Sequence, residues 1–353
     1  MDQIRDLSPI ACVINSSGVL EVPPQLEEQA RELQQQGRIQ WYSVVYPEGG
    51  WELDRSELSL LSLDELDTLP PALLRRVTTL AVAGRTVYDP NGYEVWSRWE
   101  NNAEHFYLVD RASREETPVD MGAIRDLSAF SALTGLKNLT LICQPIESLA
   151  GLENMEKLKA LELKGCPKLT DLSPAFAVQN LEKIWIEHTP VSSVQGVQNL
   201  YRLNELVLNG TQVSDLSPLT ECDFGEAEQR GGVRINLDNI PCRDFSPLAS
   251  IGHFRNLNVN NIDVKLWRED VRDCRIDELE CLNAGIDSET LAGLLSEHPE
   301  LRRLGVSWSP ELTDLTPLLE MESLEEVRVS RDMQAAIDSL NGKDLRFRLD
   351  IEG

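Results

Sequence analysis

The sequence predicts an α/β solenoid. We expect a curved array of short repeats with a parallel sheet on the concave face, short helical turns on the convex face, and an α/β cap at the N-terminal end. The first observation is a pair of apolar residues separated by one residue, which recurs with first positions at 139, 161, 184, 206, 235, 257, 279, 304 and 327. The second is the spacing of these positions, in steps of 22, 23, 22, 29, 22, 22, 25 and 23 residues. So constant a period is typical of stacked repeats and not of a generic core. The third is a recurring ending, such as Asp215-Leu216-Ser217-Pro218-Leu219.

Each repeat supplies one strand and one turn. In Leu206-Val207-Leu208 the two leucines lie on one face of a strand and the valine on the other. Such a short strand cannot bury its apolar face alone, so neighbouring strands must stack into a parallel sheet. After the strand, we expect Ser217 to cap a short helical turn with its hydroxyl and Pro218 to start that turn.

The pattern of Leu203–Leu219, LxxLxLxx(T)xVxDLSPL, resembles the leucine-rich-repeat family, and its ending is similar to the bacterial, internalin-like 22-residue class. The resemblance covers roughly residues 120–350 and implies a scaffold that binds proteins. The family usually places Asn at the turn after the strand. The equivalent positions here are Gln144, Cys166, Thr189, Thr211, Ile240, Ile262, Ala284 and Ser309. We therefore expect that ladder to be absent and the backbone groups to be satisfied in another way.

Three parts are expected: residues 1–120 as a cap or small α/β module, 121–330 as the array, and 331–353 as a C-terminal cap. Degenerate repeats are expected from about residue 71. The N-terminal part predicts a helix over Gln25–Gly37, a strand over Arg38–Tyr46 and a capping box at Ser62 before another short helix. The two degenerate repeats are placed at Val77–Val82 and Phe106–Leu108.

The C-terminal cap combines a helix and an edge strand. Met333, Ala336, Ile337 and Leu340 have helical spacing, Asn341-Gly342 predicts the stop, and Leu345–Leu349 alternates like a last strand with its arginines outward. Two polar stretches interrupt the period, Asp110–Asp120 and Glu221–Gly232. Each is either a loop that touches a ligand or a tolerated surface insertion.

Charge and cysteines restrict the function. The 353 residues carry 33 basic and 59 acidic side chains, a net charge of -26. This disfavours nucleic acid and anionic membranes and favours a basic protein partner. The start shows no secretory signal, and no apolar run reaches the ~18 residues of a membrane span. Seven cysteines without CxxC spacing and four scattered histidines predict free thiols, no metal and no cofactor. We expect a cytoplasmic protein that is monomeric when free.

A protein partner is expected on the concave face. Trp185 is a large aromatic residue where the pattern places a surface residue, so it is either a binding hot spot or shielded by a long loop. The acidic members either complement a basic partner or form only a solvated face. The candidate partner-binding residues are Glu162, Lys164, Trp185, Glu187, His188, Glu205, Asn209, Asp238, Glu278, Glu280 and Trp308.

An enzyme is not expected. The sequence contains no GxSxG, GxxxxGK[ST], HExxH or GxGxxG motif. Cys166 or Cys242 could pair with His188 or His253 as a nucleophile, but the repeat register turns both cysteines inward, where they pack as small apolar residues. The most concrete reading is a bacterial immunity or inhibitor protein that neutralises a basic toxin. The alternatives are an effector or adaptor that binds a host or cellular protein, and an ancillary domain of a larger assembly. The last fits the repeat-like stretch Asp6–Ile10.

Overall fold

A computed structural model describes residues 14–15, 19–22, 26–36, 39, 41–44, 58–60, 62–69, 71–100 and 103–352. The chain forms two compact units, residues 1–168 and 169–353, called here the N-terminal and C-terminal units. The repeat-like stretch Asp6–Ile10 and Cys12 lie outside the described residues, as do the ends of the helix predicted over 25–37 and of the strand predicted over 38–46.

The N-terminal unit begins its repeats earlier than residue 121. Strands β5 (Val77–Ala83), β10 (Asn138–Ile142) and β11 (Ala160–Lys164) pair in parallel, with Leu80 opposite Leu139 and Leu139 opposite Leu161. The degenerate repeat predicted at Val77–Val82 is therefore confirmed. Shorter strands flank β5: β1 (Ile14–Asn15), β4 (Leu58–Ser59) and β6 (Thr86–Val87).

A small α/β layer precedes these repeats. Strands β2 (Val19–Val22) and β3 (Trp41–Val44) pair in parallel beside helix α1 (Glu27–Gln35). Within the described residues, α1 and β3 were predicted and β2 was not. Their core comprises Leu20, Val22, Leu26, Ala30, Leu33 and Ile39. Two short helices follow, α2 (Glu65–Thr68) and α3 (Pro71–Leu74). The capping box at Ser62 is wrong, because the Ser62 hydroxyl contacts the Glu65 carboxylate at 3.5 Å and α2 has no side-chain cap.

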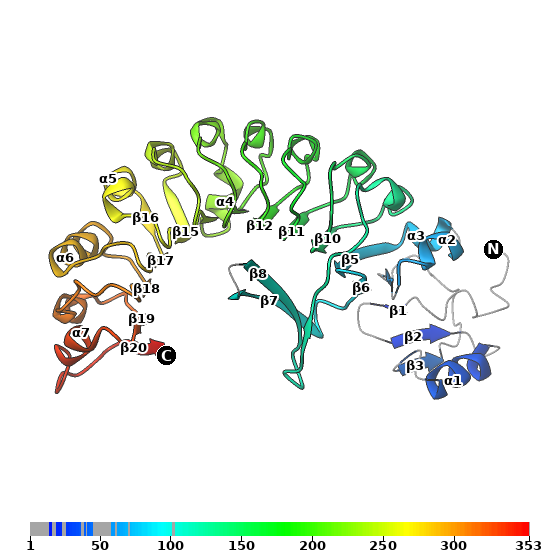
Figure 1. The fold of residues 1–353 in the computed structure, drawn as a ribbon, viewed down its shortest axis with the longest axis horizontal. Helices are drawn as coiled ribbons and strands as arrows, with labels where there is room; N and C mark the ends of the chain where they lie inside the picture. Colours follow the sequence, from blue (N-terminus) through cyan, green and yellow to red (C-terminus); the bar gives the residue numbers. More distant parts are fainter. Residues whose placement is uncertain are drawn as a thin grey trace. The chain divides into compact units, whose positions relative to one another are not determined.

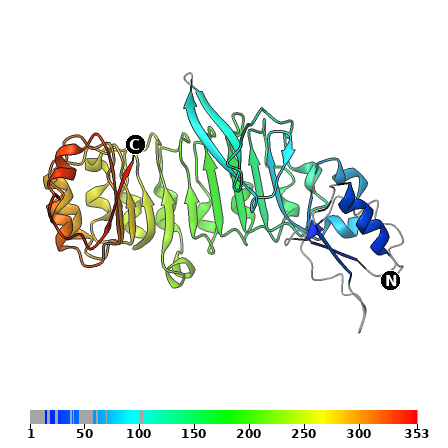
Figure 2. The ribbon, with the colours of Figure 1, turned by 90° about the horizontal axis from the view of Figure 1, so that it is seen from below.

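A separate antiparallel sheet interrupts the repeats of the N-terminal unit. Strands β7 (Tyr93–Glu100), β8 (Ala103–Asp110) and β9 (Glu116–Pro118) form it in that order. The prediction of a degenerate repeat at Phe106–Leu108 is wrong, because these residues pair with β7 and β9 and not with the repeat strands. Phe106 and Leu108 anchor the base of the hairpin against the repeat core at Ala83, Ile142 and Cys143. The rest of the hairpin projects beyond the strands of its own unit (Figure 2).

The C-terminal unit continues the pattern, one parallel strand per repeat (Figure 1). The strands are β12 (Lys183–Glu187), β13 (Glu205–Val207), β14 (Val233–Asn236), β15 (His253–Asn258), β17 (Glu278–Glu280), β18 (Arg303–Gly305), β19 (Glu326–Ser330) and β20 (Arg348–Glu352). The short β16 (Arg275–Ile276) also pairs with β15. Every predicted anchor from 184 to 327 lies opposite the next one, and Leu349 adds another opposite Val327. The predicted last strand therefore exists but lies at 348–352, not at 345–349.

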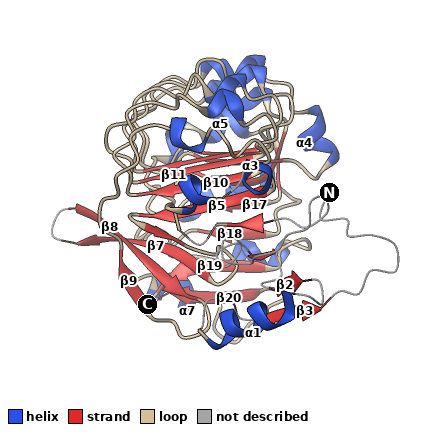
Figure 3. Cartoon of the chain, turned by 90° about the vertical axis from the view of Figure 1, so that its right-hand side faces the viewer, coloured by secondary structure: helices blue, strands red, loops and turns tan. Residues whose placement is uncertain are grey.

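The returns between strands are short helices. In the C-terminal unit, Figure 3 shows α5 (Arg268–Val271) on one side of the strands β17, β18 and β19. In the N-terminal unit the returns are η3 (Ser128–Phe130) and η4 (Leu152–Asn154). In the C-terminal unit they are η5 (Ala175–Ala177), η6 (Val197–Asn199), η7 (Ser217–Glu221), α4 (Gly225–Gln229), η8 (Ser246–Ser250), η9 (Val264–Leu266), α5 (Arg268–Val271), α6 (Ser288–Glu297), η10 (Thr316–Glu320) and α7 (Gln334–Asp338). Of the four apolar residues predicted around α7, Met333, Ala336 and Leu340 are buried and Ile337 is half-buried. Gly342 follows the helix in a turn at φ +72°.

The caps of these helical turns differ from the prediction. The serine hydroxyls do not cap them. Instead the preceding aspartate accepts a hydrogen bond from the backbone N–H two residues later, from Ser217 to Asp215 at 2.8 Å and from Ser246 to Asp244 at 3.1 Å. These are Asx turns, which fix the chain before the proline starts the helix. The contact lowers the pKa of Asp215, mainly through the Ser217 backbone.

Candidate partner-binding surface

The predicted residues lie on the sheet face or at its turns. Trp185 and Glu187 lie on β12, Glu205 on β13, and Glu278 and Glu280 on β17. Asn209 and Asp238 follow β13 and β14, and His188 and Trp308 occupy turns after β12 and β18. Glu162 and Lys164 lie on β11 of the N-terminal unit. Most of these side chains are half-buried, whereas Asp238 is buried and Trp308 is 49% exposed.

Trp185 lies between two cations. Lys183 Nζ is 4.2 Å and Arg234 Cζ 5.2 Å from the centre of its ring. Both cations also pair with Glu205 Oε1, at 3.7 and 3.3 Å. A cation over an indole contributes about 0.5–1 kcal/mol at a solvated site. Its own strand β12 and strand β14 thus each supply a cation that contacts the ring.

The charges on this face alternate in sign. Glu278 pairs with Arg303 at 3.0 Å, and Glu280 pairs with Arg328 at 3.0 Å. Arg328 also reaches Glu352, at 3.2 Å. The sequence reasoning found the acidic residues of the face but not these pairings, which need side-chain positions on neighbouring strands.

Asp238 organises a buried polar network. Its carboxylate accepts hydrogen bonds from the Asn260 backbone at 2.8 Å, the Asn260 amide at 3.0 Å and the Asn236 amide at 3.1 Å. Burial raises the pKa of Asp238 to about 6, against the lowering effect of these hydrogen bonds. Asp238 therefore holds two turns together more than it offers a charge to a partner.

Glu280 is a second carboxylate on this face whose pKa is raised by burial. Burial raises its pKa to about 7, Arg328 lowers it, and Glu352, Asp238 and Glu278 raise it further. Its carboxylate lies over Gly305, where any Cβ would overlap it. The position of Glu280 therefore depends on a glycine in the next strand.

A column of left-handed turns follows the strands, four residues after every predicted anchor except Val327. In the C-terminal unit these turns have φ between +48° and +64°, at His188, Gly210, Asn239, Asn261, Asn283 and Trp308. In the N-terminal unit the equivalent residues are Gly84, Cys143 and Gly165. Sequence reasoning missed this column, although Gly or Asn at this spacing was its signal.

The asparagines of this column form an exposed ladder. Asn239 donates to Asn209 at 3.0 Å, Asn261 to Asn239 at 2.9 Å, and Asn283 to Asn261 at 2.8 Å. This ladder lies one residue before the position at which the leucine-rich-repeat family usually has Asn. At the family's usual position, the present sequence has no Asn. At that next, buried position Thr189 and Thr211 donate to nearby carbonyls at 3.0 and 2.8 Å, so other side chains satisfy the backbone there, as expected.

His188 and Trp308 are bulky residues in a conformation that favours Gly and Asn. Trp308 has φ +57° and His188 has φ +48°. The backbone N–H of Trp308 donates a hydrogen bond to Ser330 Oγ at 2.7 Å, which fixes the turn. Backbone strain of this kind is concentrated at functional sites.

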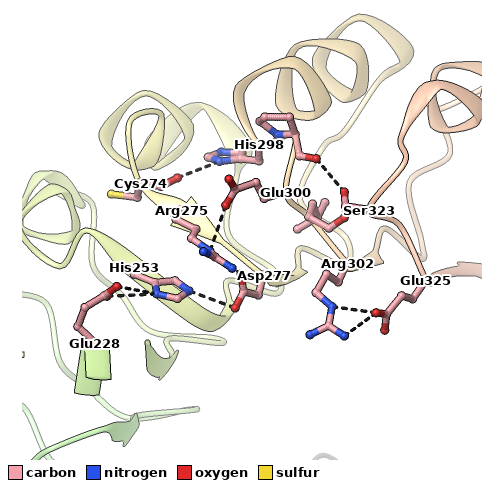
Figure 4. Close-up of polar contacts among 12 residues, drawn as sticks. Glu228, His253, Cys274, Arg275, Asp277, His298, Glu300, Arg302, Ser323 and Glu325 are labelled. Carbon is pink, nitrogen blue, oxygen red and sulfur yellow. Dashed lines mark hydrogen bonds and ion pairs between the residues drawn. The ribbon is translucent and has the colours of Figure 1, made fainter. Parts of the chain in front are cut away.

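The insertion at 221–232 is docked on the repeats. It forms α4, which buries Ala227, and Arg230 pairs with Glu182 at 3.2 Å. His253 bridges Glu228 of α4 and Asp277, each at 3.1 Å (Figure 4).

The cysteines considered as nucleophiles are buried. Cys166 is fully buried and Cys242 is 4% exposed, both inward as predicted. Burial raises the pKa of Cys166 to about 12, so it is a thiol at neutral pH. Within the described ranges no group of three or more His, Cys, Asp or Glu could hold a metal ion. No helix of that same part is long and apolar enough to cross a membrane.

A second surface was missed. The β7–β8 hairpin exposes Trp96 and Trp99, and Arg114 stacks over Trp96 at 4.6 Å. The signal was the pair Asn101-Asn102 between two alternating runs, which favours a hairpin.

The chain matches no protein-family model and no curated protein. It is similar to three solved structures from Listeria monocytogenes. An internalin (inlF) shares 15% identity over 69% of this chain and 86% of that chain, with a TM-score of 0.43. Internalin C2 shares 21% over 59% and 76% (TM-score 0.36), and the functional domain of InlJ shares 13% over 66% and 56% (TM-score 0.37).

The chain's own period, strand register and turns carry the assignment of the fold. Each repeat supplies one parallel strand, the apolar anchors lie in register, and a short helical return follows most strands. These features together define a solenoid of stacked repeats. The chain is a solenoid of leucine-rich repeats.

Proposed function

We propose that this chain is a non-catalytic scaffold that binds a protein partner on the sheet face and turn column of its C-terminal unit. The observation that carries the proposal is Trp308, an indole 49% exposed at φ +57°, where the three preceding repeats have Asn. Neither the exposure nor the backbone conformation favours folding. Exposed tryptophans are enriched among residues that dominate binding energy.

The contact surface extends from Trp308 along the turn column to His188 and onto the sheet at Trp185. The remaining contacts are proposed at Glu187, Glu205, Asn209, Glu278 and Glu280. A net charge of -26 speeds the capture of a basic partner. The alternating ion pairs on the face would then select the partner by charge pattern.

Most concretely, the partner is a basic toxin and this chain is the cytoplasmic immunity protein that covers it. An immunity gene lies beside its toxin gene. Deleting it should kill cells only when the neighbouring gene is intact. Harmless deletion beside an active neighbour would refute this role and leave the alternative, an effector or adaptor that binds a host or cellular protein.

The interface itself is tested with substitutions. The double variant Trp185→Ala/Glu187→Lys and the single variant Trp308→Asn should each weaken binding of the captured partner by about tenfold or more, measured by calorimetry. Tyr201→Ala is the matched control, because Tyr201 is 43% exposed outside this surface, and it should leave affinity unchanged. Equal losses in all variants, or loss of fold in the double variant, would contradict the proposed surface.

A further inference from the structure

Strand β7 is an unusually long open edge. It lies at one side of the sheet β7–β8–β9 and has eight residues, whereas the opposite edge, β9, has three. Residues Trp96–Glu100 are exposed in succession, and Trp99 is 69% exposed. Natural proteins shorten, cover or pair such edges because an open edge is a template for another strand.

The open edge has free backbone groups at known positions. Arg111 N–H donates to the Gly92 carbonyl at 2.9 Å, and β7 then pairs residue by residue with β8. In an antiparallel ladder every second residue bonds the neighbour, so Glu94, Trp96 and Arg98 bond β8. Val95, Ser97 and Trp99 direct their N–H and C=O groups outward, where they meet no other backbone group of the described residues.

The side chains of β7 are complementary to themselves about Trp96. Tyr93 and Trp99 are both aromatic, Glu94 and Arg98 have opposite charges, and Val95 and Ser97 are both small. We propose that the β7 edges of two copies of this chain pair antiparallel about a twofold axis at Trp96, forming a homodimer through one continuous sheet. A strand from an unrelated protein would not require this symmetry.

The pairing fits both faces of the sheet. One face would place Trp96 beside its symmetry mate and Glu94 beside Arg98 of the second copy, in the closely spaced, non-hydrogen-bonded pairs. Glu94 already contacts Arg111 and Arg114, and Arg98 contacts Glu116, so the new pairs extend an existing charge network. The other face would cover Trp99 with Tyr93, burying part of an indole of 150–250 Å².

The register is fixed by charge. A pairing centred on Ser97 would also satisfy the outward backbone groups, but it would place Glu94 opposite Glu100 of the second copy. Directly opposed like charges are destabilising, so the register centred on Trp96 is favoured. This proposal departs from the monomer expected from the sequence. It does not depend on the proposed function, because the hairpin lies outside the surface described there.

The first test is sedimentation velocity across a concentration series. The native chain should show a concentration-dependent dimer. Ser97→Pro removes an outward N–H without touching the charge network, since proline is tolerated at a sheet edge. It should raise the dimer dissociation constant by at least about tenfold. Ser97→Thr keeps the N–H and should dimerise like the native chain, with thermal melts confirming that both variants fold.

The second test reads the register. Trp96→Cys should form a disulfide-linked dimer on mild oxidation, because residue 96 faces its own symmetry mate. Arg98→Cys should link poorly to itself but should link to Glu94→Cys when the two variants are mixed. The unsubstituted chain controls for its native cysteines. A chain that is monomeric at every concentration, a dimer indifferent to Ser97→Pro, or equal self-linking at 96 and 98 would overturn the proposal.

Discussion

At the scale of single residues, the left-handed turns of the column set how much each side chain there changes the free energy of unfolding. Trp308→Asn should raise the free energy of unfolding by about 1 kcal/mol, because Asn tolerates this conformation better than Trp and would extend the ladder from Asn283. Urea unfolding measures it. The reverse type of change, Asn261→Ala, should lower the free energy of unfolding by about 1 kcal/mol. A destabilised Trp308→Asn would show that the indole supports the fold and is not reserved for a partner.

Glu280 makes stability depend on pH in an unusual direction. Its pKa is raised in the folded state to about 7, so the folded protein binds more protons than the unfolded chain between about pH 4.5 and 7. The Glu280 contribution therefore favours folding at the acidic end of this window and is lost as pH rises through 7. Glu280→Gln should raise the melting temperature at pH 8 and converge with the native chain at pH 5. Thermal melts across pH 5–8 measure this, and a constant difference would contradict it.

At the scale of elements, the period was enough to locate the repeat strands. Because side chains alternate along a strand, one apolar anchor per step fixes which face is buried, and Leu206, Ile235 and Leu257 fall opposite one another as predicted. The caps were harder to predict. In Asp215-Leu216-Ser217 either polar side chain can satisfy the next free N–H, and the residue spacing does not choose between them.

The hairpin was missed for a related reason. Phe106-Tyr107-Leu108 alternates like a repeat strand, and both settings have the same period of two. Only the strand with which Phe106–Leu108 pairs distinguishes the two settings. That strand is β7, and the pair Asn101-Asn102 between the two runs was the sequence signal for it. The cation pair around Trp185 was also beyond the sequence, because Lys183 and Arg234 meet the ring only after folding.

The insertion helix α4 should depend on His253, whose imidazole contacts both Glu228 of α4 and Asp277. His253→Ala removes both contacts and should therefore loosen α4. Hydrogen exchange of residues 225–229 should increase about severalfold in this variant, with exchange in α7 as the internal reference. Unchanged exchange in residues 225–229 would show that other contacts, such as Arg230 with Glu182, hold α4 in place without His253.

At the scale of the whole molecule, the net charge of -26 opposes compaction. Raising NaCl from 20 to 500 mM screens repulsion between like charges over the ~10 Å range that salt controls. The melting temperature should therefore rise by a few degrees. KCl at equal ionic strength should act equally. A fall in melting temperature would instead show that surface ion pairs, such as Arg302 with Glu325, outweigh the repulsion.

Composition and period together predicted the architecture of the repeat array, whereas the β7–β8–β9 sheet and the individual contacts came only from the structure. Nine anchors define a direction of growth and a repeating core. The partners of Glu205 and Asp238 depend on which residues lie opposite them on the next strand. The sequence alone does not give that register where an insertion such as α4 lengthens one step to 29 residues.

The number of repeats also sets the distance between the two tryptophans. Trp185 and Trp308 belong to different repeats of one unit, and parallel strands are spaced by about 4.8 Å. Duplicating one repeat, for example residues 257–278, would add one rung to the asparagine ladder and move the two tryptophans apart by about that distance. A change in repeat number could therefore alter which partner spans both indoles, with no change in the side chains that contact it.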